Sequence, residues 1–218
     1  MLGLFKRKTF PYTAGLCDRP VGECCFAVVD TELTGLDPRR DSIVSVGGIR
    51  MTGRRIRLGE VFYRVVKPQT ALTSESVVIH GITPSEVEGE PSIDRVLADF
   101  TDFCRGAIVV GHFISLDLKF LNKELKRLFG KELENPAVDT NSLYDWIKDH
   151  NGGPNGYPGD GENRDLFSLA QKYRIRVTGA HNALMDAYIT AQLFQRFLSR
   201  LPTLGISTAG DLLRIGRP

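Results

Sequence analysis

The sequence predicts a single α/β domain. Its 218 residues match one such domain with modest extensions, and the chain shows no internal repeat and no clear domain boundary. Short apolar runs at 26–29 and 107–111 are typical of buried strands. Longer segments at about 92–103, 117–128 and 182–201 carry apolar residues every three or four positions, which is the spacing of helices that pack on a core.

Composition predicts an ordinary core and says little about partners. The chain is 42% hydrophobic and 25% charged with a net charge of +2, so a nucleic acid would have to be held by a local patch or by metal ions. The four cysteines show no CxxC spacing, so we expect neither a zinc site nor a disulfide framework. No apolar run approaches about 18 residues, and none follows Lys6, Arg7 and Lys8. We therefore expect no membrane contact, no signal peptide and a cytoplasmic location.

The elements follow in order from an N-terminal arm at 1–22. The first strand is expected at about 25–31, and strands at 43–51 and 57–67, joined at Thr52-Gly53, should form an antiparallel hairpin. Residues 57–67 alternate only partly, so their register is open. The remaining expected elements are a helix at 74–79, a turn capped by Thr83, a helix capped by Ser92, a strand at 107–111, a helix from about Asp117, a strand at 137–139, a helix from Thr140 or Asn141 to Trp146, a loop at 151–164, helices at 166–173 and 182–201, and a turn capped by Ser207 or Thr208.

The first strand ends in two acidic residues on one face. Because side chains alternate along a strand, Asp30 and Glu32 follow Phe26 and Val28 on the same side. Two carboxylates about 4 Å apart repel by roughly 4 kcal/mol at an effective dielectric of about 20, so the pair needs cations or raised pKa values. A divalent metal would supply the charge. The alternative is an acidic strand end that faces solvent, and the pair alone favours this alternative.

Two later helices also direct acids toward the interior. Asp117 shares a helical stripe with Phe120, and Asp186 lies three residues before Ile189 and seven before Leu193. Buried unpaired carboxylates are costly, and hard divalent cations explain four of them better than separate caps or ion pairs. A two-metal site would position a nucleophile and stabilise a leaving oxygen in phosphodiester hydrolysis.

His181 precedes Asp186 by five residues. Five helical residues turn through about 500°, so the two side chains cannot share a helix face, and His181 should lie on the loop before the helix. An imidazole there could accept a proton from water near neutral pH. A surface or capping histidine is the alternative.

Four segments together resemble the DEDDh family of 3′→5′ exonucleases, which includes the proofreading epsilon subunit of bacterial DNA polymerase III. They are Asp30-Thr31-Glu32-Leu33-Thr34-Gly35-Leu36, Val110-Gly111-His112 through Asp117 with Phe120-Leu121, His181-Asn182-Ala183-Leu184-Met185-Asp186-Ala187, and His80-Gly81-Ile82-Thr83. The resemblance implies a ribonuclease H-like fold, a mixed five-stranded sheet flanked by helices. It also implies an exonuclease domain at 23–201, followed by a short C-terminal extension at 202–218.

The resemblance further implies the residues of the site. Asp30, Glu32, Asp117 and Asp186 would hold two Mg²⁺ or Mn²⁺ ions, and with His181 they would form the catalytic set. The substrate-binding residues would be Leu33, Thr34, Gly35, Leu36, His112 and Phe113. Gly35 would let the backbone approach a ligand, while ordinary core positions are the alternative for Leu33 and Leu36.

The second segment departs from the family pattern. Phe113 stands where Asn is expected and Leu116 where Phe is. A phenyl ring cannot make the hydrogen bonds of an amide, so we expect a changed loop or substrate contact with the metal ligands intact. We also expect the ring of Phe113 to pack the loop between Gly111 and Asp117.

The expected activity is metal-dependent 3′→5′ hydrolysis of single-stranded or frayed DNA ends to mononucleotide 5′-phosphates. RNA is an alternative substrate, since the sequence shows no residue that would recognise a 2′-hydroxyl and so distinguish RNA from DNA. A non-catalytic interaction module is an alternative of another class, against which the intact acids and His181 argue. Only about residues 199–218 follow the last long helix, so we expect a nuclease without a permanent polymerase partner, with a polymerase complex as the alternative.

Overall fold

The computed structural model describes residues 15–150, 163–177 and 181–218. In chain order its elements are η1 (Val21–Glu23), β1 (Cys25–Leu33), β2 (Ile43–Thr52), β3 (Arg55–Val65), α1 (Ser74–His80), α2 (Pro84–Val87), α3 (Ile93–Cys104), β4 (Ile108–Gly111), α4 (Ser115–Phe129), β5 (Ala137–Asp139), α5 (Thr140–His150), α6 (Leu166–Lys172), α7 (Ala183–Arg200), η2 (Leu201–Leu204) and α8 (Ala209–Ile215).

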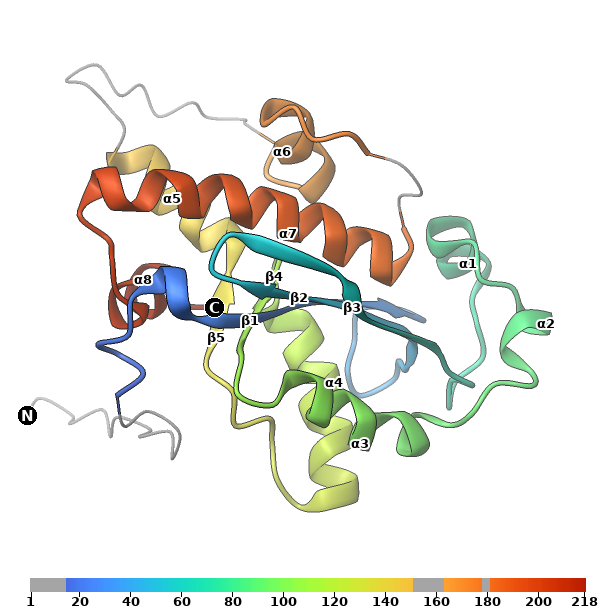
Figure 1. Ribbon diagram of the computed structural model, residues 1–218. Helices are drawn as coiled ribbons and strands as arrows, with labels where there is room; N and C mark the ends of the chain where they lie inside the picture. The colour runs from blue at the N-terminus through green and yellow to red at the C-terminus, as the bar shows by residue number, and fades with distance from the viewer. Residues whose placement is uncertain (1–14, 151–162, 178–180) are drawn as a thin grey trace, which may run out of the picture.

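A five-stranded mixed sheet in the order β3-β2-β1-β4-β5 forms the centre of the fold. β2 runs antiparallel to β1 and β3, whereas β1, β4 and β5 run parallel, so the carboxyl ends of these three strands meet at one edge. The helices α3 and α4 cover one face, and α5, α6, α7 and α8 cover the other (Figure 1). The predicted ribonuclease H-like sheet flanked by helices is confirmed.

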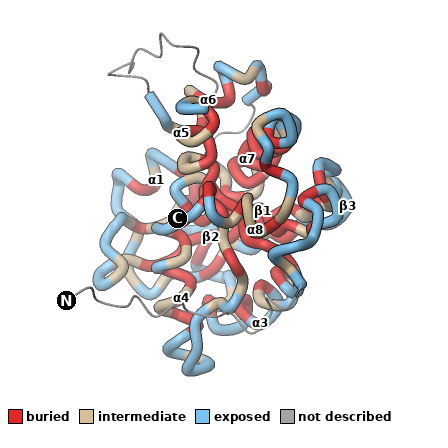
Figure 2. Tube along the Cα trace, turned by 90° about the vertical axis from the view of Figure 1, so that its left-hand side faces the viewer, coloured by how far each residue is buried: buried red, intermediate tan, exposed pale blue. Residues whose placement is uncertain are grey.

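Alternation along β1 divides the core between the two faces. Phe26 and Val28 pack on the α7 side, and Ala27 and Val29 pack against α3 and α4. Figure 2 shows the buried positions concentrated along the sheet and α7. Because β1 keeps this alternation to its end, Asp30 and Glu32 follow onto the α7 face.

Most expected elements form, with shifts of a few residues at their ends. The antiparallel hairpin is confirmed, and a bulge between Ile49 and Arg50 shifts its register, which explains the partial alternation of β3. The first strand continues to Leu33 because it still pairs with β2 there. The helix expected to end at Trp146 continues to His150.

The C-terminal segment joins the main core. Pro20 forms a β-bridge to Thr208, Thr208 caps α8 as predicted, and α8 contributes Leu212 and Ile215 to the cluster under α7. The expected arm at 1–22 lies largely, and the expected loop at 151–164 mostly, outside the described residues. The boundaries of arm, domain and extension stay predictions. Among the described helices, none is long and apolar enough to cross a membrane.

Candidate active site

Three carboxylates from two elements converge at the end of β1. Oxygen atoms of Asp30, Glu32 and Asp186 lie within 4.8 Å of one another. The first two come from β1, and Asp186 comes from the first turn of α7. Gly47 on β2 pairs with Asp30 and lets the start of α7 come close to the sheet. A Cβ atom at this glycine would lie 2.2 Å from the carbonyl carbon of Ala183. The start of α7 therefore rests directly on the backbone of β2.

Asn182 fixes the start of α7. Its Oδ1 accepts hydrogen bonds from the backbone N–H groups of Leu184 at 3.1 Å and Met185 at 3.3 Å, which caps the helix. Its Nδ2 donates to the hydroxyl of Tyr63 on β3 at 2.9 Å. Asp186, one turn further along, is thus held against the sheet by the cap and by a contact to the edge strand.

Asp117 lies in the first turn of α4 at the same edge of the sheet. The hydroxyl of Thr31 donates to its Oδ1 at 2.6 Å, which links α4 to β1. Asp117 is not part of the 4.8 Å group, but burial and then the charge of Asp117 raise the pKa of Asp30 well above its usual range. The structure therefore brings three of the four predicted metal ligands together and sets the fourth beside them.

Burial and mutual repulsion disfavour the charged forms of these acids. Burial, then the charges of Asp186 and Asp117, raise the pKa of Glu32 to about 7. Burial raises the pKa of Asp117 to about 7, although the hydrogen bond from Thr31 acts in the opposite direction. Burial also raises the pKa of Asp186 to about 6, although the charge of His181 opposes this shift. Asp186 Oδ1 is buried and has no hydrogen-bond partner within the described residues. Clustered carboxylate oxygens with unfilled acceptor capacity fit hard divalent cations such as Mg²⁺ or Mn²⁺.

These pKa shifts predict that the metal-free protein loses stability as the pH rises. A carboxyl group with a raised folded-state pKa binds more protons in the folded than in the unfolded state, so its contribution falls as the pH passes through the folded pKa. For Glu32 and Asp117, at about 7, the loss between pH 6.5 and 8 is on the order of 1–2 kcal/mol, or roughly 5 °C in Tm. Burial lowers the pKa values of His80 and His112, so these two groups bind fewer protons in the folded than in the unfolded state and oppose part of this loss.

Thermal unfolding in EDTA at the two pH values measures this effect. Mg²⁺ at pH 8 should restore the lost stability, because bound cations replace protons as the partners of the carboxylates. A Tm in EDTA that rises between pH 6.5 and 8 would show that deprotonation of these carboxyl groups does not destabilise the metal-free protein.

His181 lies on the segment before α7, as the spacing predicts. Its backbone is left-handed, with a φ of 62°, and the residue is exposed. Its backbone N–H donates to Asp186 Oδ2 at 3.2 Å, and its ring meets that of Phe167 edge-on with centroids 5.0 Å apart. The histidine is therefore adjacent to the acids and contacts α6 through its ring.

The segment after β1 is held by its own contacts. Thr34 is buried, donates to Asp41 Oδ1 at 3.2 Å and accepts from the backbone of Ser42 at 3.0 Å. A Cβ atom on Gly35 would lie 2.5 Å from Asp41 Oδ2, so the close approach to this glycine is made by that carboxylate. Leu33 packs on the α3–α4 side. Leu36, in contrast, is 75% exposed and accessible to a ligand.

His112 and Phe113, both predicted to bind substrate, differ in exposure. His112 Nε2 donates to the carbonyl of Arg164, and Nδ1 lies 2.8 Å from the hydroxyl of Thr140. Phe113 has a φ of 54° and its side chain is 48% exposed, so the expectation that this ring packs the loop is wrong. The fully buried Ile114 packs there instead. Asn, the residue expected at 113, adopts left-handed backbone more readily than Phe.

Sequence reasoning missed Asp139 at the end of β5. This buried carboxylate accepts from the backbone N–H groups of Phe113 at 3.2 Å and Asn141 at 2.7 Å, and burial raises its pKa. It therefore ties the loop after β4 to the start of α5. The signal was present in the sequence, because the apolar pair before Asp139 ends in an acid as β1 does.

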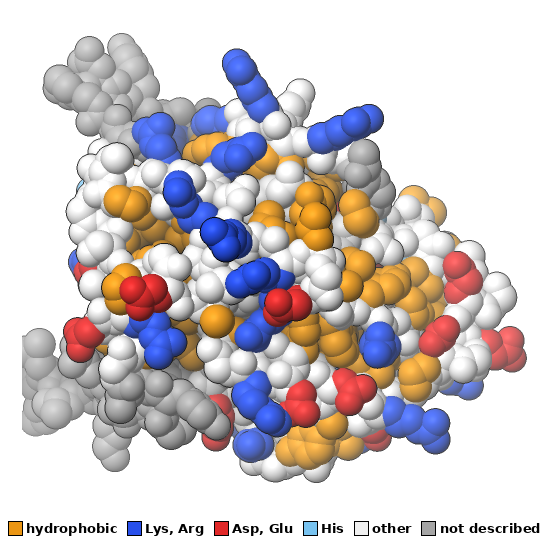
Figure 3. All heavy atoms as spheres, in the orientation of Figure 1, with side chains coloured by type: hydrophobic (Ala, Val, Ile, Leu, Met, Phe, Trp, Pro, Cys, Tyr) orange, Lys and Arg blue, Asp and Glu red, His pale blue; other side chains and the backbone are white. Residues whose placement is uncertain are grey.

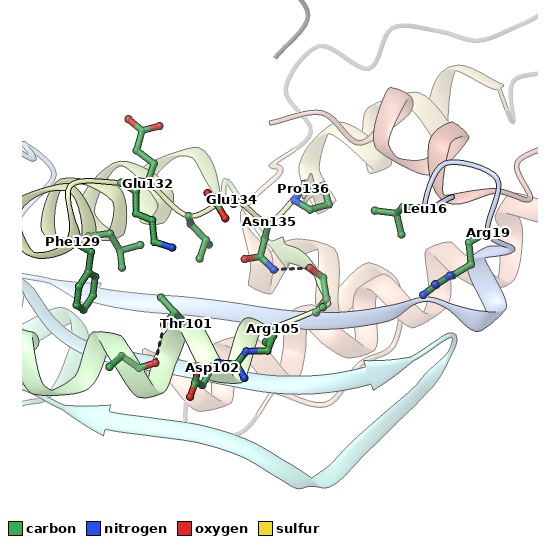
Figure 4. A pocket seen from close by; sticks show the side chains of 16 residues that line it. Leu16, Arg19, Thr101, Asp102, Arg105, Phe129, Glu132, Glu134, Asn135 and Pro136 are labelled. Carbon is green, nitrogen blue, oxygen red and sulfur yellow. Dashed lines mark hydrogen bonds and ion pairs between the residues drawn. The ribbon is translucent and has the colours of Figure 1, made fainter. Parts of the chain in front are cut away.

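A separate hollow of about 600 Å³ lies near the opposite edge of the sheet (Figure 4). It is lined by the ends of α3 and α4 and by the residues that precede β4 and β5, where the Asn135 amide donates to the carbonyls of Cys104 and Ala107. None of the four predicted metal ligands lines it. The candidate site is therefore the acidic carboxyl edge of the sheet, not this hollow.

The model of a protein family described as Exonuclease (RNase_T) matches residues 27–194. This chain belongs to the exonuclease family. It is 32% identical to DNA polymerase III subunit epsilon of Aquifex aeolicus over 81% of each chain. It is 34% identical to a DNA polymerase III subunit epsilon-like protein of Rhodobacter capsulatus and 30% identical to a PolC-type DNA polymerase III of Thermotoga maritima. These matches cover 92% and 91% of this chain but only 27% and 14% of those longer proteins.

Solved structures share the fold of this exonuclease domain. E. coli exonuclease I in complex with a dT13 oligonucleotide matches 84% of this chain and 43% of its own, with a TM-score of 0.72 and 20% identity. Exonuclease X in complex with 5′ overhanging duplex DNA matches 88% of this chain and 99% of its own, with a TM-score of 0.63 and 22% identity. The family match and the epsilon relative confirm the DEDDh-type resemblance.

Proposed function

We propose that this chain is a metal-dependent 3′→5′ exonuclease that hydrolyses single-stranded or frayed DNA ends to mononucleotide 5′-phosphates. The observation that carries the proposal is the group formed by Asp30, Glu32 and Asp186 at the carboxyl edge of the sheet, with Asp117 beside it. DNA is favoured over RNA as substrate because fold neighbours were solved with DNA strands and the relatives carry DNA polymerase names.

The proposed reaction is attack of water on the last phosphodiester. Two Mg²⁺ or Mn²⁺ ions held by the four carboxylates would supply Lewis acidity to the water and to the leaving oxygen. His181 accepts the proton of the attacking water. The bond from phosphorus to the 3′ oxygen of the preceding nucleotide breaks, so the released nucleotide keeps a 5′-phosphate and the strand ends in a new 3′-hydroxyl. Leu33 and Leu36 contact the terminal base, and a paired end must first fray at a cost of a few kcal/mol.

Replacing His181 with alanine is expected to lower kcat strongly and to leave metal affinity nearly unchanged. General-base catalysis contributes roughly 10²–10⁴-fold, so kcat should fall within that range. Collapse of Mn²⁺ binding in His181→Ala would instead make His181 a metal ligand or a structural residue.

Digestion of strands labelled at either end tests the proposed polarity. With Mg²⁺, a 3′-labelled 20-nucleotide DNA strand should lose its label at once as a mononucleotide, and a 5′-labelled strand should shorten stepwise. Circular single-stranded DNA should survive, EDTA should stop the reaction, and matched RNA should react more slowly. Prompt cleavage of circles, or early release of the 5′ label, would contradict the polarity. Absence of hydrolysis of any strand would favour an interaction module.

Two further expectations are proposals at this stage. We propose that the domain acts without a permanent polymerase partner, although its relatives are named as polymerases or polymerase subunits. We also propose a cytoplasmic location.

A further inference from the structure

We propose that a second site on this domain binds backbone phosphates of the nucleic-acid substrate on the 5′ side of the hydrolysed bond. This inference rests on the proposed nuclease function. The arginine site, as we call it, consists of Arg54, Arg55 and Arg57 at the start of β3 and Arg196 on α7, which line a hollow of about 610 Å³. Figure 3 shows basic side chains gathered over the β2–β3 hairpin and the adjoining part of α7.

The positive charge of the arginine site is not neutralised by the protein. All four arginines are exposed, and none forms an ion pair with an acid in the part of the chain that the structure describes. The other residues that line the hollow are neutral, namely Gly22, Thr52, Gln195 and Ser199. Four like charges in one hollow repel each other, and a bound polyanion relieves that repulsion. Since the chain carries a net charge of only +2, this is a local concentration of charge.

Neutral contacts hold the hairpin turn and Arg54 of the arginine site in place before any ligand binds. Gly53 turns the hairpin with a φ of +52° and packs so closely that a Cβ atom there would lie 2.4 Å from the carbonyl oxygen of Gly22. The Gln195 amide donates to the carbonyl of Arg54 at 2.6 Å, and Arg54 Nη1 donates to Ser199 Oγ at 3.2 Å. A preformed site loses less conformational entropy on binding. The planar guanidinium group of arginine can donate two parallel hydrogen bonds to the oxygens of a phosphate.

The distance from the acids to the arginine site determines how long a substrate must be to reach both. Asp186 and Arg196 are ten residues apart on α7, which is about 15 Å along the axis. On β2, Gly47 pairs with Asp30, and Thr52 beside the arginines lies five residues further, or about 17 Å. A strand in helical form advances about 3.4 Å per nucleotide, so about five nucleotides separate the two sites. A 20-nucleotide strand reaches both sites, whereas a trinucleotide reaches only the acids.

Binding of a fluorescein-labelled 20-nucleotide DNA strand in EDTA, followed by anisotropy, tests the proposal without hydrolysis. Each phosphate neutralised on a single strand contributes about 0.7 to the salt slope, or about fivefold in affinity at 0.1 M salt. The double variant R55Q/R196Q should therefore bind about 25-fold more weakly and lower the slope of log K against log[NaCl] by about 1.4. The variant R55K/R196K should keep most of the slope. The control R95Q/K131Q removes two exposed charges on the α3–α4 side and should change affinity less than twofold.

Turnover of a trinucleotide with Mg²⁺ separates this site from the acids. R55Q/R196Q should turn over the trinucleotide like the wild type but show a raised KM for the 20-nucleotide strand. Unchanged binding of the long strand by R55Q/R196Q, a loss no larger than that of R95Q/K131Q, or an equal loss with the trinucleotide would overturn the proposal. If the wild type hydrolyses nothing yet R55Q/R196Q binds the long strand more weakly, the proposed nuclease function fails while the arginine site stands.

Discussion

Asp186→Asn is expected to abolish most activity while stabilising the metal-free protein. The carboxamide keeps an oxygen that can accept the backbone N–H of His181, now bonded to Asp186 Oδ2 at 3.2 Å, but removes one negative charge. Loss of a partner that merely supports a metal ligand commonly costs 10–100-fold, so loss of a ligand should cost at least 100-fold in kcat/KM. Because Asp186 is the main charge that raises the pKa of Glu32, repulsion falls and Tm in EDTA should rise.

Steady-state kinetics on single-stranded DNA and thermal unfolding in EDTA measure the two effects. The matched control is Asp99→Asn, which removes the same charge from an exposed position on α3 and should change neither quantity. Full activity in Asp186→Asn would remove this residue from the site. Loss of activity together with a large fall in Tm would show a structural rather than a catalytic role.

Gly47→Ala is expected to lower both activity and stability. The added methyl group would lie 2.2–2.3 Å from backbone atoms of Ala183 and Leu184, and backbone at the start of a capped helix cannot move aside freely. The start of α7 must shift, and Asp186 with it. A misplacement of about 1 Å commonly costs about 100-fold in rate, and overpacking costs roughly 1–3 kcal/mol in stability.

The control for this variant lies on the same sheet. A Cβ atom added to Gly59 on β3 would meet nothing within 4 Å beyond its chain neighbours, so Gly59→Ala should leave kcat/KM and Tm nearly unchanged. The two glycine variants are compared by activity assay and by thermal unfolding. If Gly47→Ala were as active as Gly59→Ala, the close contact between β2 and α7 would not set the position of the acids.

The directions in which the four acidic side chains point could be predicted from the sequence, because each depends on a local pattern. Strand alternation put Asp30 and Glu32 on one face, and helical spacing turned Asp117 and Asp186 inward. The structure places all four at the edge where the parallel strands end, so the local patterns and the fold agree. The position of His181 outside α7 followed from the same kind of reasoning.

The contacts that set the geometry could not be predicted, because they join residues far apart in the chain. The bond from Thr31 to Asp117 spans 86 positions, and that from Asn182 to Tyr63 spans 119. In the sequence Gly47 is an ordinary glycine in an apolar strand, and only the packing of α7 against β2 shows that a larger residue would not fit there. Such pairings depend on the packing of helices on the sheet, which local propensity does not specify.

Calorimetric titration of Mn²⁺ into the wild type at pH 7, in two buffers of different ionisation enthalpy, tests the central claim that the acid cluster is a divalent-metal site. One or two ions should bind and release at least about one proton per protein, because Glu32 and Asp117, with pKa values of about 7, are each about half protonated beforehand. The raised pKa of Asp30 adds to this release. Asp186→Asn should bind Mn²⁺ at least tenfold more weakly, and Asp99→Asn like the wild type. Absence of Mn²⁺ binding to the folded wild type, or equal binding by Asp186→Asn, would contradict the account.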